Sequence, residues 1–469
     1  MRIEQDSLGQ VLVPDDALWG AQTQRAIDNF KISGLRPLAS YVRATTLVKQ
    51  AAAVVNMDLG LLDARCGQAI AQVAAEIAQG ERYDQFVVDP FQAGAGTSHN
   101  MNANEVIANL ANEALGGKRG TYLPIHPNDH VNMAQSTNDV IPAVIRVAAS
   151  LELPALMTAV QNLAQALAGK AQEFDGILKS GRTHLQDAVP VRLGQEFGAY
   201  AAAVAHDGER IAGVAEGVKR LGIGGTAAGT GLNSHPTYHP RMIAKLCELT
   251  GISFVSSGNL FESMQSTADL LDLSAALRTL AITLTRICND LRLLSSGPST
   301  GLAEITLPAL QPGSSIMPGK VNPVMPEMLT MVCFRVIGND ETIMLASQAG
   351  QLELNVMIPI IAYTLLQSIE ILTNGLQALT NKCIVGIQAN SERCLRYAEH
   401  SSGLATALNA YIGYPAAAKV AQEALARGVS LRQVVLEHSY LTVEQLDVIL
   451  DPRAMTEPGI PGKHDFEQS

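Results

Sequence analysis

Aromatic residues make up only 4% of this 469-residue chain, and Trp19 is its single tryptophan. Aromatic and β-branched residues favour strands, whereas alanine and leucine, which are abundant here, favour helices. Because 47% of the residues are hydrophobic, the chain can bury a large core. The composition therefore predicts an all-α fold.

Long basic runs are also missing from the sequence. The formal net charge is −11 and the pI is about 5.4. Nucleic acids and anionic membranes attract clusters of lysine and arginine, so we expect neither as a partner. The first residues, MRIEQDSLGQVLVPDD, lack a basic segment followed by an apolar one, and no run of about 18 uncharged apolar residues appears. We therefore expect a cytoplasmic protein that does not span a membrane.

Closely spaced cysteine pairs are missing as well. The six cysteines are Cys66, Cys247, Cys288, Cys333, Cys383 and Cys394. Their wide spacing is typical of buried, reduced thiols in a large protein and not of a metal site. We expect no structural zinc ion.

What the sequence does contain is long stretches with apolar residues at helical spacing. They cover about 140–176, 191–220, 260–295, 323–346 and 351–382, each much longer than the mean of about 12 residues for globular helices. Five such helices predict an elongated central bundle. We expect an N-terminal domain over 1–138, the long-helix bundle over 139–391, and a small helical C-terminal domain over 392–469.

Four polar segments rich in hydroxyl and amide side chains lie before or between these stretches. They are GTSHN (96–100), QSTND (135–139), GRTHLQ (181–186) and GSSIMPGKVNP (313–323). Serine, threonine and asparagine before a helix often serve only as N-caps, and Thr97, Ser136 and Thr137 fit that role. The alternative is that the segments together form a binding site.

The length of the helix expected between two of these segments decides whether one chain can form such a site. If residues 140–176 form one helix, its ends are about 50 Å apart, which separates Ser136 from Thr183. One chain cannot then bring both residues to the same ligand. A shared site would need a closed homo-oligomer whose bundles pack antiparallel.

The segments resemble, in order, the motifs of the aspartase/fumarase superfamily. The shared motifs are GTSHNMNANEV, HPNDHVNMAQSTND, GRTHLQDAVP, GGTAAGTGLN, CNDLRLLSSGP and the signature loop GSSIMPGKVNP, and the likeness covers essentially the whole chain. It implies a central domain of five long helices that forms a twenty-helix core in a homotetramer. The active sites would be shared among subunits.

Within the superfamily, GTS and QSTND resemble aspartate ammonia-lyases more than class II fumarases. The resemblance thus implies reversible elimination of ammonia from L-aspartate, with fumarate as product. A fumarase, or a lyase for another substituted succinate or amino acid, is the alternative. The identity of the substrate is not decided, because Ser299 stands where the superfamily commonly has an arginine.

The resemblance also implies roles for individual residues. Ser314 would be the general base that removes the proton next to the carboxylate, through an enediolate intermediate stabilised by fixed donors. An ordinary serine holds its proton too tightly, so backbone N–H groups of the loop, made available by its glycines, and the cation of Lys320 would stabilise its oxyanion. The residues expected to bind substrate are Thr97, Ser98, Ser136, Thr137, Asn138, Thr183, Lys320 and Asn322.

His184 is expected to assist proton transfer, with Glu327 as its carboxylate partner. The glycine-rich GGTAAGTGLN lacks the lysine and the strand–turn–helix setting of a nucleotide loop, so we expect no cofactor. A divalent cation could still activate the enzyme from a site that the sequence does not reveal. The expected partners are thus a small dicarboxylate or amino-acid substrate and further copies of the chain.

Overall fold

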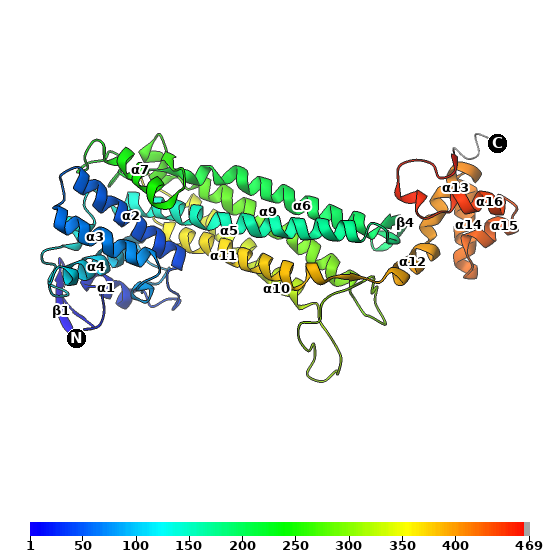
Figure 1. Ribbon diagram of the computed structural model, residues 1–469, viewed down its shortest axis with the longest axis horizontal. Coiled ribbons are helices and arrows are strands. Elements are labelled where there is room, and N and C mark those ends of the chain that lie inside the picture. Colours follow the sequence, from blue (N-terminus) through cyan, green and yellow to red (C-terminus); the bar gives the residue numbers. More distant parts are fainter. Residues whose placement is uncertain (464–469) are drawn as a thin grey trace. The chain divides into compact units, whose positions relative to one another are not determined.

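The structure is a computed structural model that describes residues 1–463 (Figure 1). The described residues form two compact units, and each unit is assembled from several segments. The first comprises Met1–Ala159, Asp207–Ile282 and Met331–Asn374, and the second comprises Val160–His206, Thr283–Thr330 and the described residues from Gly375 onward. The three-domain division expected from the sequence stays a prediction.

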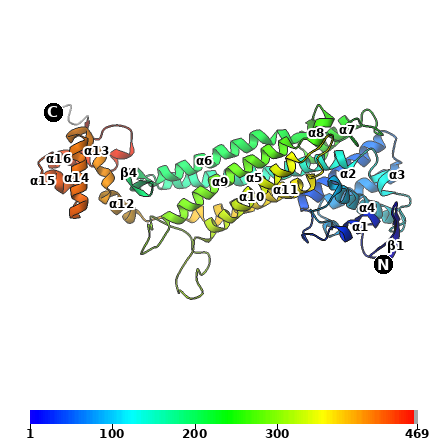
Figure 2. The same cartoon turned by 180° about the vertical axis from the view of Figure 1, so that it is seen from behind.

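The first unit begins with a short hairpin followed by four helices. The hairpin pairs strands β1 (Arg2–Asp6) and β2 (Gly9–Val13), and the helices are α1 (Ala21–Asn29), α2 (Ala39–Asp58), α3 (Ala64–Ala78) and α4 (Thr97–Ala114). Their apolar faces meet in one core that includes Val42, Ile70 and Val106. Helix α7 (Tyr238–Thr250) packs against α2 in the same unit (Figure 2).

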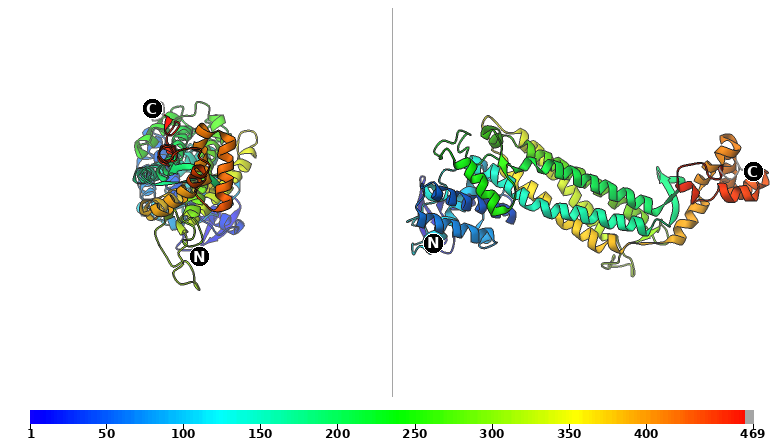
Figure 3. Two further views of the ribbon diagram at one scale, coloured as in Figure 1. Left: turned by 90° about the vertical axis from the view of Figure 1, so that its right-hand side faces the viewer. Right: turned by 45° about the horizontal axis from the view of Figure 1, so that its top comes forward.

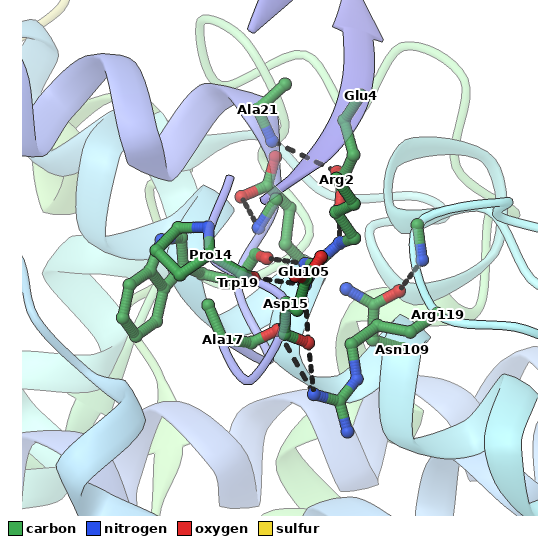
Figure 4. Close-up of polar contacts among 12 residues, drawn as sticks. Arg2, Glu4, Pro14, Asp15, Ala17, Trp19, Ala21, Glu105, Asn109 and Arg119 are labelled. Atoms are coloured by element: carbon green, nitrogen blue, oxygen red, sulfur yellow. Dashed lines mark hydrogen bonds and ion pairs between the residues drawn. The ribbon is translucent and has the colours of Figure 1, made fainter. Parts of the chain in front are cut away.

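Buried charges attach the N-terminal segment to α4 (Figure 4). The Glu105 carboxylate on α4 accepts the backbone N–H groups of Gly20 and Thr23 at 2.8 and 3.1 Å. It thereby satisfies free donors at the start of α1. Arg2 donates to the carbonyl oxygens of Pro14 and Trp19, both at 2.6 Å. These bonds fix α4, whose first residues belong to the predicted site.

Five helices of 23 residues or more lie within residues 1–463, which confirms the prediction of five long helices. They are α5 (Thr137–Glu173), α6 (Leu193–Ala215), α9 (Ala268–Leu294), α10 (Val324–Gln348) and α11 (Ile358–Lys382). Each helix contributes residues to both units. Strands are short and few among the described residues, so the predicted all-α class is confirmed as well.

The helix predicted over 260–295 is wrong in one respect, because it is broken near its start. Helix α8 (Leu260–Gln265) ends before α9 begins. Arg146 on α5 donates to the carbonyl oxygens of Ser263 and Ser266 at 3.2 and 3.1 Å, and it also pairs with Asp269. A side chain from another helix therefore replaces helical hydrogen bonds at the break, which local spacing does not reveal.

The second unit contains short strands and short helices in addition to its parts of the long helices. They are β3 (Leu178–Thr183), β4 (Gln186–Arg192), β7 (Ile305–Thr306), β8 (Gln388–Ala389), α12 (Ser391–His400), α13 (Ala405–Ile412), α14 (Tyr414–Arg427), α15 (Leu431–Glu437) and α16 (Val443–Ile449). A further pair, β5 (Arg220–Leu221) and β6 (Val255–Ser256), is parallel and lies in the first unit. Helices α13 to α16 share a small core, seen as the orange and red helices in Figure 3. Residues 307–323 form a loop without helix or strand between β7 and α10.

Helix α5 is long and apolar enough that its composition alone would let it cross a membrane. However, 72% of its most apolar 18-residue window is buried inside the protein. Its apolar character is therefore that of a core helix.

The cysteines are free thiols, and five of the six are buried, as the sequence predicts; Cys247 is partly exposed. Burial raises the pKa of Cys383 and of Cys394 to about 12. Trp19 is partly buried in the first unit, where its indole N–H donates to Gln24 at 3.2 Å.

Candidate active site

The GTS segment begins helix α4 through a tight turn. Gly94, Ala95 and Gly96 all have positive φ values (74°, 54° and 94°), which glycine adopts at little cost. A Cβ on Gly96 would lie 2.9 Å from the Ile141 side chain, so this turn packs closely on the first turn of α5. Thr97 follows the turn, and its hydroxyl donates to the Gly94 carbonyl at 2.7 Å.

Ser136, Thr137 and Asn138 form the start of α5. The Ser136 hydroxyl accepts the Asn138 N–H at 3.2 Å, and the Asp139 carboxylate accepts the Ser136 N–H at 2.9 Å. This reciprocal arrangement is a helix cap, so the capping role considered from the sequence is correct for Ser136. It leaves the Ser136 O–H and the Thr137 side chain at a helix N-terminus, where anions are favoured.

The glycine-rich segment GGTAAGT supports this helix start. Asp139 accepts the N–H groups of Gly224 and Thr226 at 2.8 and 3.0 Å, and Asn138 donates to Ala227 at 2.9 Å. Burial raises the pKa of Asp139 to about 6 although three backbone N–H groups and Lys49 favour its charged form. The segment that resembles a nucleotide loop is thus a support for the QSTND segment.

A buried polar layer that the sequence did not reveal as functional lies beneath these hydroxyls. It contains the buried Lys49, His99 and Asn100, and the partly buried Asn132 bonds to Lys49 and Asn100. Burial lowers the pKa of Lys49 to about 7, and burial together with Lys49 lowers the pKa of His99 to about 3. A lysine inside the apolar run TTLVKQAAAVV was the available signal, because an unpaired lysine is rarely fully buried.

In the second unit, strands β3 and β4 form an antiparallel hairpin that carries Thr183 and His184. Thr183 pairs with Gln186, and the two residues between them, His184 and Leu185, have φ values of 55° and 59°. Two positive φ values are the requirement of a type I′ turn. The turn exposes both Thr183 and His184.

A buried ion cluster holds this hairpin at its base. The Glu304 carboxylate, which is fully buried, lies 2.9 Å from Arg182 and 3.1 Å from Lys179. The Arg182 guanidinium also stacks over the Tyr397 ring at 5.5 Å. No local sequence pattern indicates a role for Glu304, because its two partners are more than 100 positions away in the chain.

The signature loop is closed at its neck by two hydrogen bonds. The Gly313 N–H donates to the Lys320 carbonyl at 2.7 Å, and the Asn322 amide donates to the Gly313 carbonyl at 2.8 Å. A Cβ on Gly313 would lie 2.6 Å from the Lys320 oxygen, so only glycine permits this approach. Asn322 therefore shapes the loop in the single chain.

Ser314 lies inside this closed loop. Its hydroxyl oxygen accepts the N–H groups of Ile316 at 3.2 Å and Met317 at 3.0 Å. Two donors aimed at one hydroxyl oxygen favour its deprotonated form. Both donors are backbone N–H groups of the loop.

A cavity of about 450 Å³ lies beside the loop in the second unit. Its lining includes Lys320 and Asn322 from the loop, and Arg292, Ser295 and Ser296 from the end of α9 and the residues that follow. Two cationic side chains and several hydroxyl and amide groups give it the chemistry of an anion site.

The predicted site residues thus form two groups. Thr97, Ser98, Ser136, Thr137 and Asn138 belong to the first unit, whereas Thr183, His184, Ser314, Lys320, Asn322 and Glu327 belong to the second. Glu327 lies in the first turn of α10. Within residues 1–463 no ion pair joins His184 to Glu327, so their pairing stays a prediction for the assembled protein.

Comparison with known proteins identifies the family. Residues 9–338 match the lyase family, and residues 404–457 match the fumarase C C-terminus. Aspartate ammonia-lyase of Bacillus subtilis is 49% identical over 100% of this chain and 98% of its own length. Class II fumarate hydratase of Methylorubrum extorquens is 50% identical over 97% of each chain.

A solved structure gives the same result. The fumarate lyase:delta crystallin of Brucella melitensis, bound to cobalt, has a TM-score of 0.93 and 48% identity over 97% of this chain and all of its own. The two family matches cover most of the chain, and the relatives and the solved structure cover nearly all of it. The chain is a lyase that belongs to the aspartase/fumarase superfamily.

Proposed function

We propose that the protein is an aspartate ammonia-lyase, which converts L-aspartate to fumarate and ammonium. Ser314 takes a proton from the carbon next to the side-chain carboxylate, and the electron pair is held in that carboxylate as an enediolate. The C–N bond then breaks, the double bond forms, and ammonia leaves with its electron pair. The proton taken by Ser314 is later released to solvent.

The observation that carries this proposal is the environment of the Ser314 oxygen. It accepts two backbone N–H groups, from Ile316 and Met317. Because these donors are fixed by the loop backbone, they stabilise negative charge without reorganising during the reaction. A serine in this setting is suited to act as a base, whereas an ordinary loop serine is not.

The other polar groups are proposed to hold the substrate. Lys320 supplies positive charge for a carboxylate, and Asn322 adds hydrogen bonds. The hydroxyl and amide groups of Thr97, Ser98, Ser136, Thr137, Asn138 and Thr183 orient the carboxylates and the amine. His184, paired with Glu327, assists proton transfer to the leaving group.

These groups require more than one copy of the chain. Helix α5 has 37 residues and is therefore about 55 Å long, with Ser136 before its first residue and Thr183 beyond its last. We propose that the site is completed by residues from neighbouring subunits of a homotetramer.

The proposed chemistry needs no organic cofactor, because a base and a set of charge-stabilising donors suffice for the elimination. The proposal includes a cytoplasmic enzyme without a resident metal ion. Activity that survives dialysis against a chelator would support this even if a divalent cation then raises it, and activity that is absent without an added divalent cation would contradict it.

A second candidate is class II fumarate hydratase, in which water replaces ammonia. The 50% identity to the Methylorubrum extorquens enzyme favours it, as do the shared loop motifs. The two reactions share the proton abstraction and differ in the leaving group. An assay with each substrate therefore distinguishes the two reactions, whereas a test of the base does not.

The deciding experiment measures fumarate absorbance after adding either L-aspartate or L-malate to the purified protein. Fumarate from aspartate is expected, and fumarate from malate alone would establish the second candidate. In the same assay, Ser314→Ala is expected to lower kcat by about 10²- to 10⁴-fold. Ser315→Ala is the matched control, because it removes the neighbouring hydroxyl and leaves the base in place.

A further inference from the structure

Lys49, in the middle of α2, is fully buried beneath the QSTND segment. Its ammonium nitrogen lies 3.0 Å from the side-chain oxygen of Asn132 and 3.0 Å from that of Gln135. Buried ammonium groups usually contact a carboxylate, since burial of a charge is otherwise costly. This one is held instead by two neutral amides, which makes it a candidate for a functional role.

The two amides lie on either side of a strained residue. Ala134, between Asn132 and Gln135, has a φ of 60°, a conformation that residues other than glycine rarely adopt. Lys49 thus holds the chain immediately before and after this position. Ser136 and Thr137 follow directly, so their placement depends on the conformation of Ala134.

A second path connects Lys49 to the hydroxyl of Thr137. The Asn132 oxygen that binds Lys49 also accepts the Asn100 amide at 3.2 Å. The same Asn100 amide donates to the Thr137 oxygen at 3.2 Å. Because that bond occupies the Thr137 oxygen, the Thr137 O–H is left to point toward a ligand.

We infer that Lys49 is a positioning residue whose ammonium group holds the Ser136 and Thr137 hydroxyls in the arrangement that binds a dicarboxylate. Lys49 itself does not touch the substrate. The inference rests on the proposed function only in that the site binds a dicarboxylate. It holds equally for aspartate and for malate.

This arrangement makes ligand binding depend on pH. Burial lowers the pKa of Lys49 to about 7, and the charge of Asp139 opposes that shift. The ionisable groups that interact with Lys49 are Asp139 on α5, whose charge favours the protonated lysine, and His99 on α4, whose pKa Lys49 lowers. Tyr41 on α2 stacks on the same histidine, and Tyr238 on α7 interacts with Asp139. As pH rises through about 7, Lys49 loses its proton and the two amides lose their charged donor.

The test measures binding of succinate, a dicarboxylate that cannot react, by thermal stabilisation of the protein. For the wild type, affinity is expected to fall about tenfold between pH 6.5 and pH 8.5, because charged hydrogen bonds are stronger than neutral ones. Lys49→Met is expected to bind weakly at both pH values. Lys170→Met, which removes another buried lysine, is the matched control and should keep the wild-type pH dependence.

Two further variants separate positioning from simple stability. Adding Ala134→Gly to Lys49→Met should recover much of the lost affinity, because glycine adopts the positive φ at little cost. Asn132→Asp places a carboxylate beside Lys49, so the loss of affinity should move to higher pH by about one unit or more. Neither result follows if Lys49 only stabilises the fold.

The inference is overturned if Lys49→Met binds succinate with the wild-type pH dependence, which would assign that dependence to another group such as the exposed His184. Should Lys49→Met fail to fold, an unshifted Asn132→Asp profile would overturn it. Absence of activity on aspartate and malate would refute the proposed function alone, since succinate binding remains measurable. A wild type that converts aspartate but does not bind succinate would refute the inference alone.

Discussion

At the scale of single residues, the first unit keeps a neutral histidine in its core. His99 is fully buried, lies 2.9 Å from the Thr45 hydroxyl and stacks on the Tyr41 ring at 4.2 Å. The Thr45 hydroxyl donates to the Tyr41 carbonyl, so the His99 ring nitrogen facing it carries the proton. Its neutral state keeps a second positive charge away from Lys49.

This histidine should make the protein sensitive to acid. The pKa of His99 is lowered to about 3 in the folded state, and an unfolded histidine titrates near 6.5. The unfolded state therefore binds more protons between these values, and stability is lost as pH falls from about 6.5 toward 3. When the pH falls from 6 to 5, the free energy of unfolding should decrease by about 1 kcal/mol less in His99→Gln than in the wild type.

Urea unfolding at the two pH values measures this difference. Equal losses in both proteins would contradict the pKa shift of His99. The opposite contribution of Asp139, whose pKa is raised to about 6, is present in both proteins and cancels.

At the scale of elements, the β3–β4 hairpin depends on the buried Glu304. Glu304→Gln would leave the buried end of Arg182 without a carboxylate partner, while Lys179 would keep only its pair with Glu196. Removing one partner of a buried ion pair typically costs about 3–5 kcal/mol. We expect that loss of unfolding free energy together with a lower kcat/KM, because the hairpin presents Thr183 and His184.

The control is Glu216→Gln, which removes an exposed carboxylate paired with Lys219. Exposed pairs are worth about 0–1 kcal/mol, so this variant should stay close to the wild type in denaturant unfolding. A Glu304→Gln protein that also stays close would show that the hairpin is held by other contacts.

Helices and loops were predictable from the sequence to different extents. The long helices follow from apolar spacing, which is a local property, and α5 was placed within a few residues. The break between α8 and α9 was missed because it depends on Arg146, more than 100 positions earlier. Lys49 and Glu304 were missed for the same reason, since distant partners define their roles.

At the scale of the whole molecule, α10 presents apolar side chains to solvent in the single chain. Met331 and Phe334 are 65% and 60% exposed, and Leu345 is 50% exposed. Large exposed apolar side chains on one helix indicate a surface that another chain covers. The proposed homotetramer supplies that chain.

Phe334→Lys should therefore weaken assembly, because a buried charge in a subunit interface is costly. Light scattering is expected to show smaller species, and activity should fall with the loss of the shared site. Leu425→Lys, at an 80% exposed position on α14, is the control and should leave the mass unchanged. A fully active Phe334→Lys monomer would contradict the shared site.

The position of the single tryptophan gives the molecule a built-in optical reporter. Trp19 belongs to the first unit, so fluorescence excited selectively from tryptophan reports denaturation of that unit and not of the second. Circular dichroism, by contrast, follows helices throughout the chain. If the two signals change at different urea concentrations, the units melt in separate steps, and the long helices do not couple them into one cooperative transition.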